Sequence, residues 1–207
     1  MDVSRPYGVV SHPLDSAALY VLAGTTQGLT GRKIARLAPE GSQQGIAKAL
    51  NRLTESGLVE QELAGSSVLY RLNRRHLAAP AVELLVNLRG ELITRLVKAF
   101  AHWEIPPRHA SLFGSAARGD GNSASDIDLF VVRPDGVDAE DSIWRGQLDK
   151  LAEDVRAWTG NYASIAEVAD SDLTELRSRR PAIVEALEID ARTLNGPDIA
   201  TLIGGLR

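Results

Sequence analysis

Two aspartates are the residues of this chain whose type and spacing point most directly to chemistry. Asp126 and Asp128 stand two positions apart, around the start of the apolar stretch Ile127 to Val132. In a strand, period-two alternation places both carboxylates on one face, roughly 7 Å apart along the backbone. Such oxygen ligands suit Mg²⁺ (or Mn²⁺), which takes one or two carboxylates and completes its octahedron with phosphate oxygens and water. We therefore predict that Asp126 and Asp128 bind metal and serve catalysis.

A glycine–serine pair precedes the aspartates at the end of an expected strand, His109 to Phe113. Gly114 lets the backbone approach a ligand closely, and Ser115 could cap a following helix while offering its hydroxyl. A helix N-terminus is a natural phosphate cradle. Arg118, about one turn further on, either contacts phosphate or braces the carboxylates. A phosphate cradle beside a metal-binding pair predicts metal-assisted attack on a nucleotide phosphate, and Gly114, Ser115 and Arg118 are the candidate residues for binding that nucleotide.

The complete signature reads Gly114-Ser115-Ala116-Ala117-Arg118-Gly119, followed by Ser125-Asp126-Ile127-Asp128-Leu129. It resembles the signature of the DNA-polymerase-beta-like nucleotidyltransferase superfamily, in particular the minimal nucleotidyltransferases, over roughly residues 105–170. The resemblance implies that Gly114 and Ser115 hold the triphosphate and that Asp126 and Asp128 bind the metals.

One position departs from the pattern of this superfamily. Members with transfer activity usually carry a third carboxylate on the next strand, where it completes the metal site and helps deprotonate the acceptor hydroxyl. The alignment places Ser164 there, and a neutral hydroxyl is a poor base and a weaker ligand. Glu167, three residues on, is expected on the opposite strand face. A register shift, a bulge, or Asp170 and Asp172 beyond the strand would compensate, so nucleotide binding is better supported than turnover.

Alternating strands and helices position this site. Strands are expected at His109–Phe113, Ile127–Val132 and Tyr162–Val168, and helices at Asp141–Trp158, Ser171–Arg179 and Pro181–Leu194. The fold class is α+β, with a nucleotidyltransferase-like α/β domain over residues 105–207 built on a small mixed sheet.

The front of the chain has a different organisation. Three short helices are expected at Asp15–Ala23, after Thr30 and from Ser42 to Gly57, followed by a hairpin of Leu58–Leu63 and Val68–Leu72. This layout, with the phrase Leu53-Thr54-Glu55-Ser56-Gly57-Leu58-Val59, resembles the winged helix-turn-helix of MarR- and ArsR-like regulators. The resemblance implies a DNA-binding domain over residues 1–75.

Polar side chains on the presumed recognition helix and wing are the candidate contacts to double-stranded DNA. Gln and Asn suit adenine, Arg suits guanine and Lys suits phosphate. The candidates are Gln43, Gln44, Lys48, Asn51, Arg52 and Arg71, with Arg74 and Arg75 as further phosphate contacts. The alternative is a winged helix used only for protein contacts.

Residues 76–104 are expected to form a connecting helix, because Pro80 to Trp103 carries apolar residues at intervals of three and four. This helix either packs on one of its own domains or forms a homodimer interface, which would suit a two-fold operator.

The two parts of the chain carry opposite net charges, which suggests that each part has a different partner. Residues 1–75 hold nine Lys/Arg and six Asp/Glu, whereas residues 76–207 hold fourteen and twenty-one. There is no cysteine, no secretory signal and no apolar run long enough to span a membrane, so a cytoplasmic location is expected.

The leading hypothesis is a DNA-binding transcriptional regulator whose second domain binds NTP and Mg²⁺ and transfers NMP to a hydroxyl if it turns over. The alternatives are an antitoxin-type nucleotidyltransferase that modifies a partner protein, and a transferase acting on a small molecule such as an antibiotic.

Overall fold

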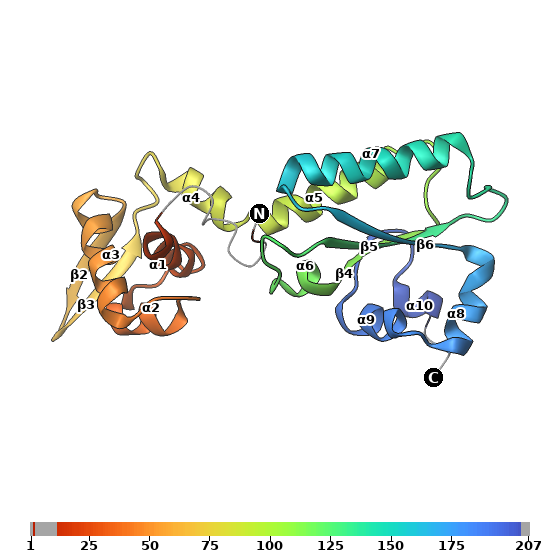
Figure 1. Cartoon of the computed structure of the whole chain (residues 1–207). Helices are drawn as coiled ribbons and strands as arrows, with labels where there is room; N and C mark the ends of the chain where they lie inside the picture. Colours follow the sequence, from red (N-terminus) through yellow and green to blue (C-terminus); the bar gives the residue numbers. More distant parts are fainter. Residues whose placement is uncertain (1, 3–11, 204–207) are drawn as a thin grey trace. The chain divides into compact units, whose positions relative to one another are not determined.

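The computed structural model of the chain describes Asp2 and residues 12–203. These residues form two compact units that divide between Leu88 and Arg89 (Figure 1). The outer ends of the expected domains 1–75 and 105–207 lie partly outside the described residues. Each unit is considered separately below.

From residue 12 onward, the N-terminal unit has four helices and a small antiparallel sheet of order β1-β3-β2. Its elements are α1 (Pro13–Ala23), β1 (Leu29–Thr30), α2 (Gly31–Leu37), α3 (Gln43–Glu55), β2 (Val59–Ala64), β3 (Ser67–Leu72) and α4 (Ala79–Val86). Leu22, Ile34, Ile46 and Leu50 are fully buried in its core. The three helices and the hairpin follow one another in the predicted order.

The helix caps at Thr30 and Ser42 are present, whereas α1 begins at Pro13, before the expected start at Asp15, and has no side-chain cap. The hydroxyl of Thr30 accepts a hydrogen bond from the Lys33 amide at 3.3 Å, and that of Ser42 accepts one from Gly45 at 3.1 Å. Each cap satisfies an amide that has no partner within the first turn of a helix. At the other end of α3, Gly57 adopts the left-handed conformation (φ +76°) that favours glycine.

The C-terminal unit is a sheet of order β6-β5-β4-β7 covered by helices on both faces. Its elements are α5 (Leu88–Ala101, whose first residue belongs to the other unit), β4 (His109–Phe113), α6 (Gly114–Arg118), β5 (Ile127–Arg133), α7 (Ser142–Thr159), β6 (Ala163–Ala169), the 3₁₀ turn η2 (Asp170–Asp172), α8 (Leu173–Arg179), α9 (Ala182–Asp190), β7 (Arg192–Asn195) and α10 (Ile199–Ile203). β5 and β6 run parallel, whereas β4 is antiparallel to both β5 and β7. The predicted small mixed sheet is therefore confirmed.

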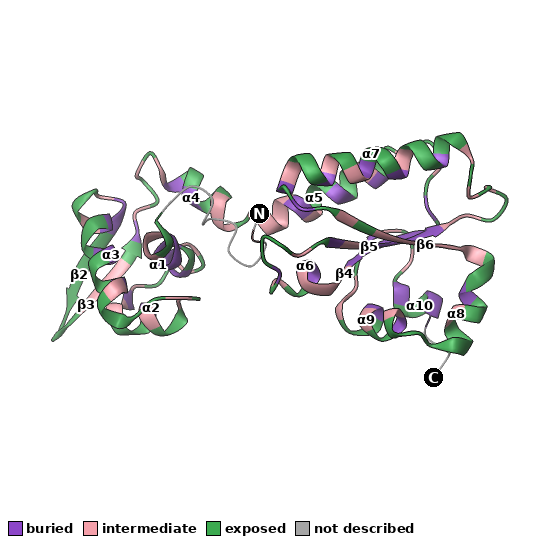
Figure 2. Cartoon of the chain, in the orientation of Figure 1, coloured by how far each residue is buried: buried purple, intermediate pink, exposed green. Residues whose placement is uncertain are grey.

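Strand β5 is mostly buried (Figure 2), and its side chains belong alternately to two cores. Ile127, Leu129 and Val131 pack with residues of α5 and α7, whereas Phe130 and Val132 pack with residues of α8, α9 and α10. Figure 1 shows α5 and α7 on one side of the sheet and α8 to α10 on the other. Because side chains alternate along a strand, Asp128 belongs to the same face as Phe130.

Two sequence predictions of secondary structure were wrong. The single helix expected from Pro80 to Trp103 is interrupted at Asn87, so that α4 belongs to the first unit and α5 to the second. The helix expected over Pro181–Leu194 ends at Asp190, and Arg192 to Asn195 form β7 instead. β7 exists because β4 offers it a free edge, which is a tertiary contact that local periodicity does not encode.

Candidate nucleotide and metal site

Asp126 and Asp128 lie at the start of β5, where β4 ends and β6 begins. In the sheet Asp128 is paired with Phe113 of β4 on one side and with Ser164 of β6 on the other. Its side chain is half-buried, whereas that of Asp126 is exposed. The strand thus holds one carboxylate against the protein and presents the other to solvent.

Gly114 lies directly against the Asp128 carboxylate. A Cβ atom at position 114 would stand 2.4 Å from Oδ2 of Asp128, and the glycine has φ +67°. Both facts require glycine, because an L side chain would clash and would also strain the backbone. The end of β4 and the acidic pair are therefore built as one site.

The half-buried position of Asp128 changes its acidity. Burial raises the pKa of Asp128, the negative charge of Asp126 raises it further, and Arg118 opposes both effects. A bound cation would favour the ionised form of Asp128, whose pKa burial raises.

Ser115 and Arg118 lie on the five-residue helix α6, which begins at Gly114. Ser115 does not cap this helix as predicted, because α6 begins one residue earlier and Phe113 occupies the cap position. Arg118 pairs through Nε with Asp120 at 3.0 Å and through Nη1 with Asp190, whose side chain is only 7 % exposed. The ion-pair partners of Arg118 are thus Asp120 and Asp190, not the predicted Asp126 and Asp128, and its contact with phosphate stays a prediction.

Two residues that the sequence reasoning missed support this region. Nε of Arg89 in α5 donates to the carbonyl oxygen of Ala116 at 3.1 Å, and Nη2 donates to that of Ala117. These bonds satisfy carbonyl oxygens at the end of α6, because the last carbonyls of a helix have no hydrogen-bond donor within the helix itself. Asn161, between α7 and β6, donates to backbone carbonyls of the loop before Asp126. Their partners are at least 27 positions away, so no local pattern could have revealed them.

Ser164 occupies the position next to Asp128 that the alignment predicted for it. Glu167 does not compensate, because it accepts hydrogen bonds from Arg133 and from the indole of Trp144 on the α7 side, each at 2.9 Å. Asp170 follows the far end of β6 and pairs with Arg108 at 3.5 Å. Asp172 follows Asp170 in the same 3₁₀ turn. Glu167 is three residues from Ser164, roughly 10 Å along the strand and on its other face, whereas Asp170 and Asp172 follow the end of the strand, roughly 20 Å or more from Ser164.

The comparison with known protein families agrees with this geometry. Residues 93–195, from within α5 to the end of β7, match the family described as the nucleotidyltransferase domain. Residues 93–195 are therefore similar to a nucleotidyltransferase domain. The match includes Gly114, Ser115, Asp126 and Asp128, and it extends beyond the region of predicted resemblance on both sides. No curated protein matches the chain significantly. Within the described residues, no helix has both the length and the apolar character needed to cross a membrane.

The residues of this candidate site fit a divalent metal that is shared with a nucleotide. Over residues 12–203, no cluster of three or more His, Asp or Glu side chains is arranged to hold a metal by protein ligands alone. Two carboxylates are nevertheless enough for Mg²⁺ when phosphate oxygens complete the shell. Because Gly114 has no side chain, its backbone lies directly against the Asp128 carboxylate.

On the N-terminal unit, the candidate DNA contacts divide into two groups. Gln43, Gln44, Lys48 and Asn51 are exposed on α3. The other two candidates are engaged within the protein: Arg52 pairs with Asp15 of α1 at 2.5 Å, and Arg71 pairs with Glu62 across the hairpin at 2.9 Å.

The further arginine candidates also differ from each other. Arg74 pairs with Glu83 at 3.0 Å and donates to the carbonyl oxygens of Ala23 and Thr25, so it binds α1 and α4 to the hairpin. Arg75 is exposed.

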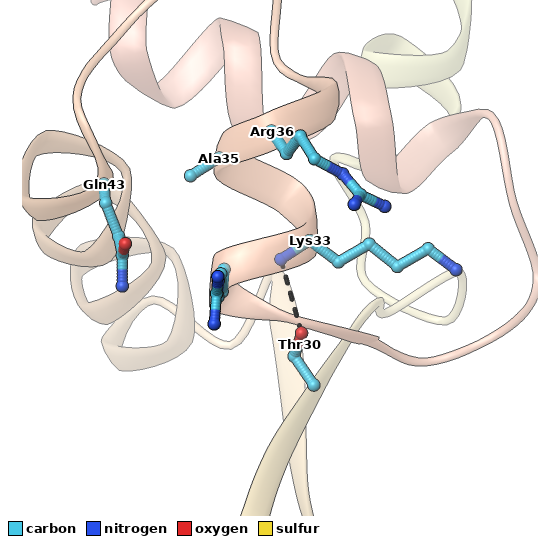
Figure 3. Close-up of a pocket in the computed structure, with 6 residues that line it drawn as sticks. Thr30, Lys33, Ala35, Arg36 and Gln43 are labelled. Carbon is cyan, nitrogen blue, oxygen red and sulfur yellow. Dashed lines mark hydrogen bonds between the residues drawn. The ribbon is translucent and has the colours of Figure 1, made fainter.

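A cluster of cations on α2 was not predicted. Arg32, Lys33 and Arg36 are exposed and, among the described residues, have no ion-pair partner. Together with Thr30, Ala35 and Gln43 they line a hollow of about 510 Å³ (Figure 3). Figure 3 shows Lys33 and Arg36 extending from the same side of α2. The sequence signal was available, because these residues flank the buried Ile34 at helical spacing.

Proposed function

We propose that this protein is a transcriptional regulator whose nucleotidyltransferase domain binds an NTP together with Mg²⁺. The observation that carries the proposal is the packing of the Asp128 carboxylate against Gly114, beside Asp126. It joins a backbone turn suited to phosphate with an acidic pair suited to a divalent cation.

The residues of the site would divide the work of binding. Asp126 and Asp128 would hold the metal, while the backbone around Gly114 and the hydroxyl of Ser115 would bind the triphosphate. A bound divalent cation supplies positive charge that orients and polarises the phosphates. Arg118, held by Asp120 and Asp190, would keep α6 and its phosphate-binding end in place.

If the domain turns over, the reaction is the transfer of NMP to a hydroxyl acceptor. The acceptor oxygen bonds to the α-phosphorus, the bond from that phosphorus to the bridging oxygen breaks, and pyrophosphate leaves. The proton of the acceptor passes to water, because Ser164 stands where a carboxylate base would be. Turnover is therefore expected to be slow in comparison with binding.

Binding of double-stranded DNA by the N-terminal unit, as a winged helix, is the second part of the proposal. Its support is the exposed polar face of α3 next to the free cations Arg32, Lys33 and Arg36 on α2. Cations without internal partners can neutralise phosphates at little cost to the fold. The excess of positive charge in residues 1–75 agrees with this partner.

Two experiments test these parts separately. Calorimetric titration with each NTP, with and without Mg²⁺, is expected to show metal-dependent binding that Asp126→Ala and Asp128→Ala abolish. A mobility-shift titration against the upstream region of the gene, at stated salt, is expected to show a sequence preference. Absence of any preference there and in a selection from random DNA would remove the regulator role and leave the nucleotide site standing.

Transfer of NMP to a partner protein is the competing function. The exposure of Asp126 and Ser164 favours it over a small-molecule acceptor, since a macromolecule can reach an open site. Incubation with labelled NTPs, Mg²⁺ and candidate partner proteins would reveal label on protein. Label that persists in Asp126→Ala and Asp128→Ala would mean that the site is assigned wrongly.

A further inference from the structure

The backbone on both sides of Asp126 is fastened to the junction between α7 and β6. On one side, the carbonyl oxygen of Ser125 accepts a hydrogen bond from the side-chain amide of Asn161 at 2.7 Å. On the other, the amide of Ile127 donates to the carbonyl oxygen of Tyr162 at 2.8 Å. Asp126 itself is exposed, so these two bonds to adjoining residues restrain its position.

Asn161 is itself held firmly. It is 3 % exposed, and its backbone amide donates to the hydroxyl of Thr159 at 3.0 Å. That hydroxyl donates in turn to the carbonyl oxygen of Val155 in the last turn of α7, at 2.7 Å. These bonds attach the backbone of Asn161 to the end of the 18-residue helix α7, and its side-chain amide extends from this fixed backbone.

The same amide also organises the loop that leads to Asp126. Its Nδ2 lies 3.3 Å from the carbonyl oxygen of Asn122, while the amide of Asn122 donates to the hydroxyl of Ser125 at 3.0 Å. Two N–H groups directed at carbonyl oxygens require an amide, since an aspartate of the same shape would offer only acceptors. The chemistry of Asn161 is therefore specific to this contact.

We propose that Asn161 is a positioning residue for the metal and nucleotide site. It holds residues 122–125 so that Asp126 stays beside Asp128, although the two negative charges repel each other. The proposal rests on the proposed binding of metal and NTP at this pair. Groups that orient metal ligands in this way typically contribute about 10–100-fold to metal affinity.

The test uses the full chain and the variants Asn161→Ala and Asn161→Asp. Calorimetric titration with Mg²⁺ and ATP is expected to show roughly 10–100-fold weaker binding in both, recovered at high Mg²⁺ because the ligands remain present. Asp126→Ala should not recover. The matched control is Asn195→Ala, since Asn195 also donates to a backbone carbonyl, that of Pro107 at 3.1 Å, but from β7. This control should bind ATP as the wild type does.

Hydrogen exchange in the metal-free protein gives a readout that does not depend on nucleotide. Both Asn161 variants should speed exchange of the amides of residues 122–127, with β4 and β7 unchanged. If the Asn161 variants do not fold, Thr159→Val removes the hydroxyl that supports Asn161 and should give the same changes, smaller in size.

The outcomes separate this inference from the function it rests on. Failure of the wild type to bind any NTP overturns the proposed function, whereas unchanged exchange in residues 122–127 overturns the positioning role. If the wild type binds ATP and Asn161→Asp binds equally well at low Mg²⁺, the inference alone is wrong.

Discussion

The carboxylate of Asp128 and the backbone of Gly114 occupy adjoining space, with no room for a Cβ atom between them. This contact joins the end of β4 to the start of β5. It makes the acidic pair and the glycine–serine turn parts of one site.

Gly114→Ala is expected to abolish nucleotide and metal binding and to destabilise the C-terminal unit by more than the left-handed backbone alone explains. That backbone strain costs about 1–2 kcal/mol for an L residue, and the clash with Asp128 adds to it. Calorimetry and thermal unfolding measure the two effects. Gly136→Ala is the matched control, because Gly136 has φ +82° with nothing within 4 Å of its would-be Cβ. Equal losses of stability in the two variants would show that the contact with Asp128 is not important.

Asp128→Asn is expected to stabilise the metal-free protein at neutral pH. Because the folded state raises the pKa of Asp128, its ionised form opposes folding; this penalty is absent below the usual aspartate pKa and fully present above the raised one. The variant should therefore unfold at a higher temperature than the wild type at pH 7, and the difference should vanish as the pH falls below the usual aspartate pKa. Thermal unfolding in chelator across pH tests this. A variant that is less stable than wild type at pH 7 would contradict the assigned burial and repulsion.

For the wild type, the same pKa shift predicts the pH dependence of metal binding. Protons compete with Mg²⁺ for Asp128, so affinity should begin to fall at a higher pH than for an ordinary aspartate. Mg²⁺ titrations at a series of pH values measure it.

Ser164→Asp is expected to increase both metal affinity and NMP transfer. Ser164 is the sheet neighbour of Asp128, so a carboxylate there would add a third charged ligand and a base. Metal affinity should rise about tenfold, while the metal-free protein should become less stable because three negative charges adjoin. Ser164→Ala, which adds no carboxylate, serves as the control. If Ser164→Asp transfers no more label than wild type, the missing carboxylate is not what limits turnover.

Replacement of Arg32, Lys33 and Arg36 by alanine is expected to weaken DNA binding and its salt dependence. Loss of three phosphate contacts should lower the slope of log affinity against log salt by about 3. Arg52→Ala should leave that slope nearly unchanged, because Arg52 is paired with Asp15. Fluorescence anisotropy at several salt concentrations distinguishes the two. An unchanged slope in the triple variant would exclude α2 from the DNA contact.

The sequence by itself determined which residues are candidates for the site and the local structure that surrounds them. Period-two alternation placed Asp126 and Asp128 correctly relative to the buried Ile127 and Leu129, and the caps at Thr30 and Ser42 were readable because their partners lie three residues away. The alignment of Ser164 with a missing carboxylate also agrees with the register of β5 and β6.

Only the tertiary structure decided which charged groups are free and which are used internally. Arg52 and Arg71 were predicted to bind DNA, yet each has a carboxylate partner, whereas Arg32, Lys33 and Arg36 have none among the described residues. The strand β7, the support of α6 by Arg89 and the hold of Asn161 on the loop before Asp126 were equally hidden. The physical reason is common to all of them. A hydrogen bond or an ion pair forms between groups that folding brings together, and a pattern along the chain records only the partners that are near in sequence.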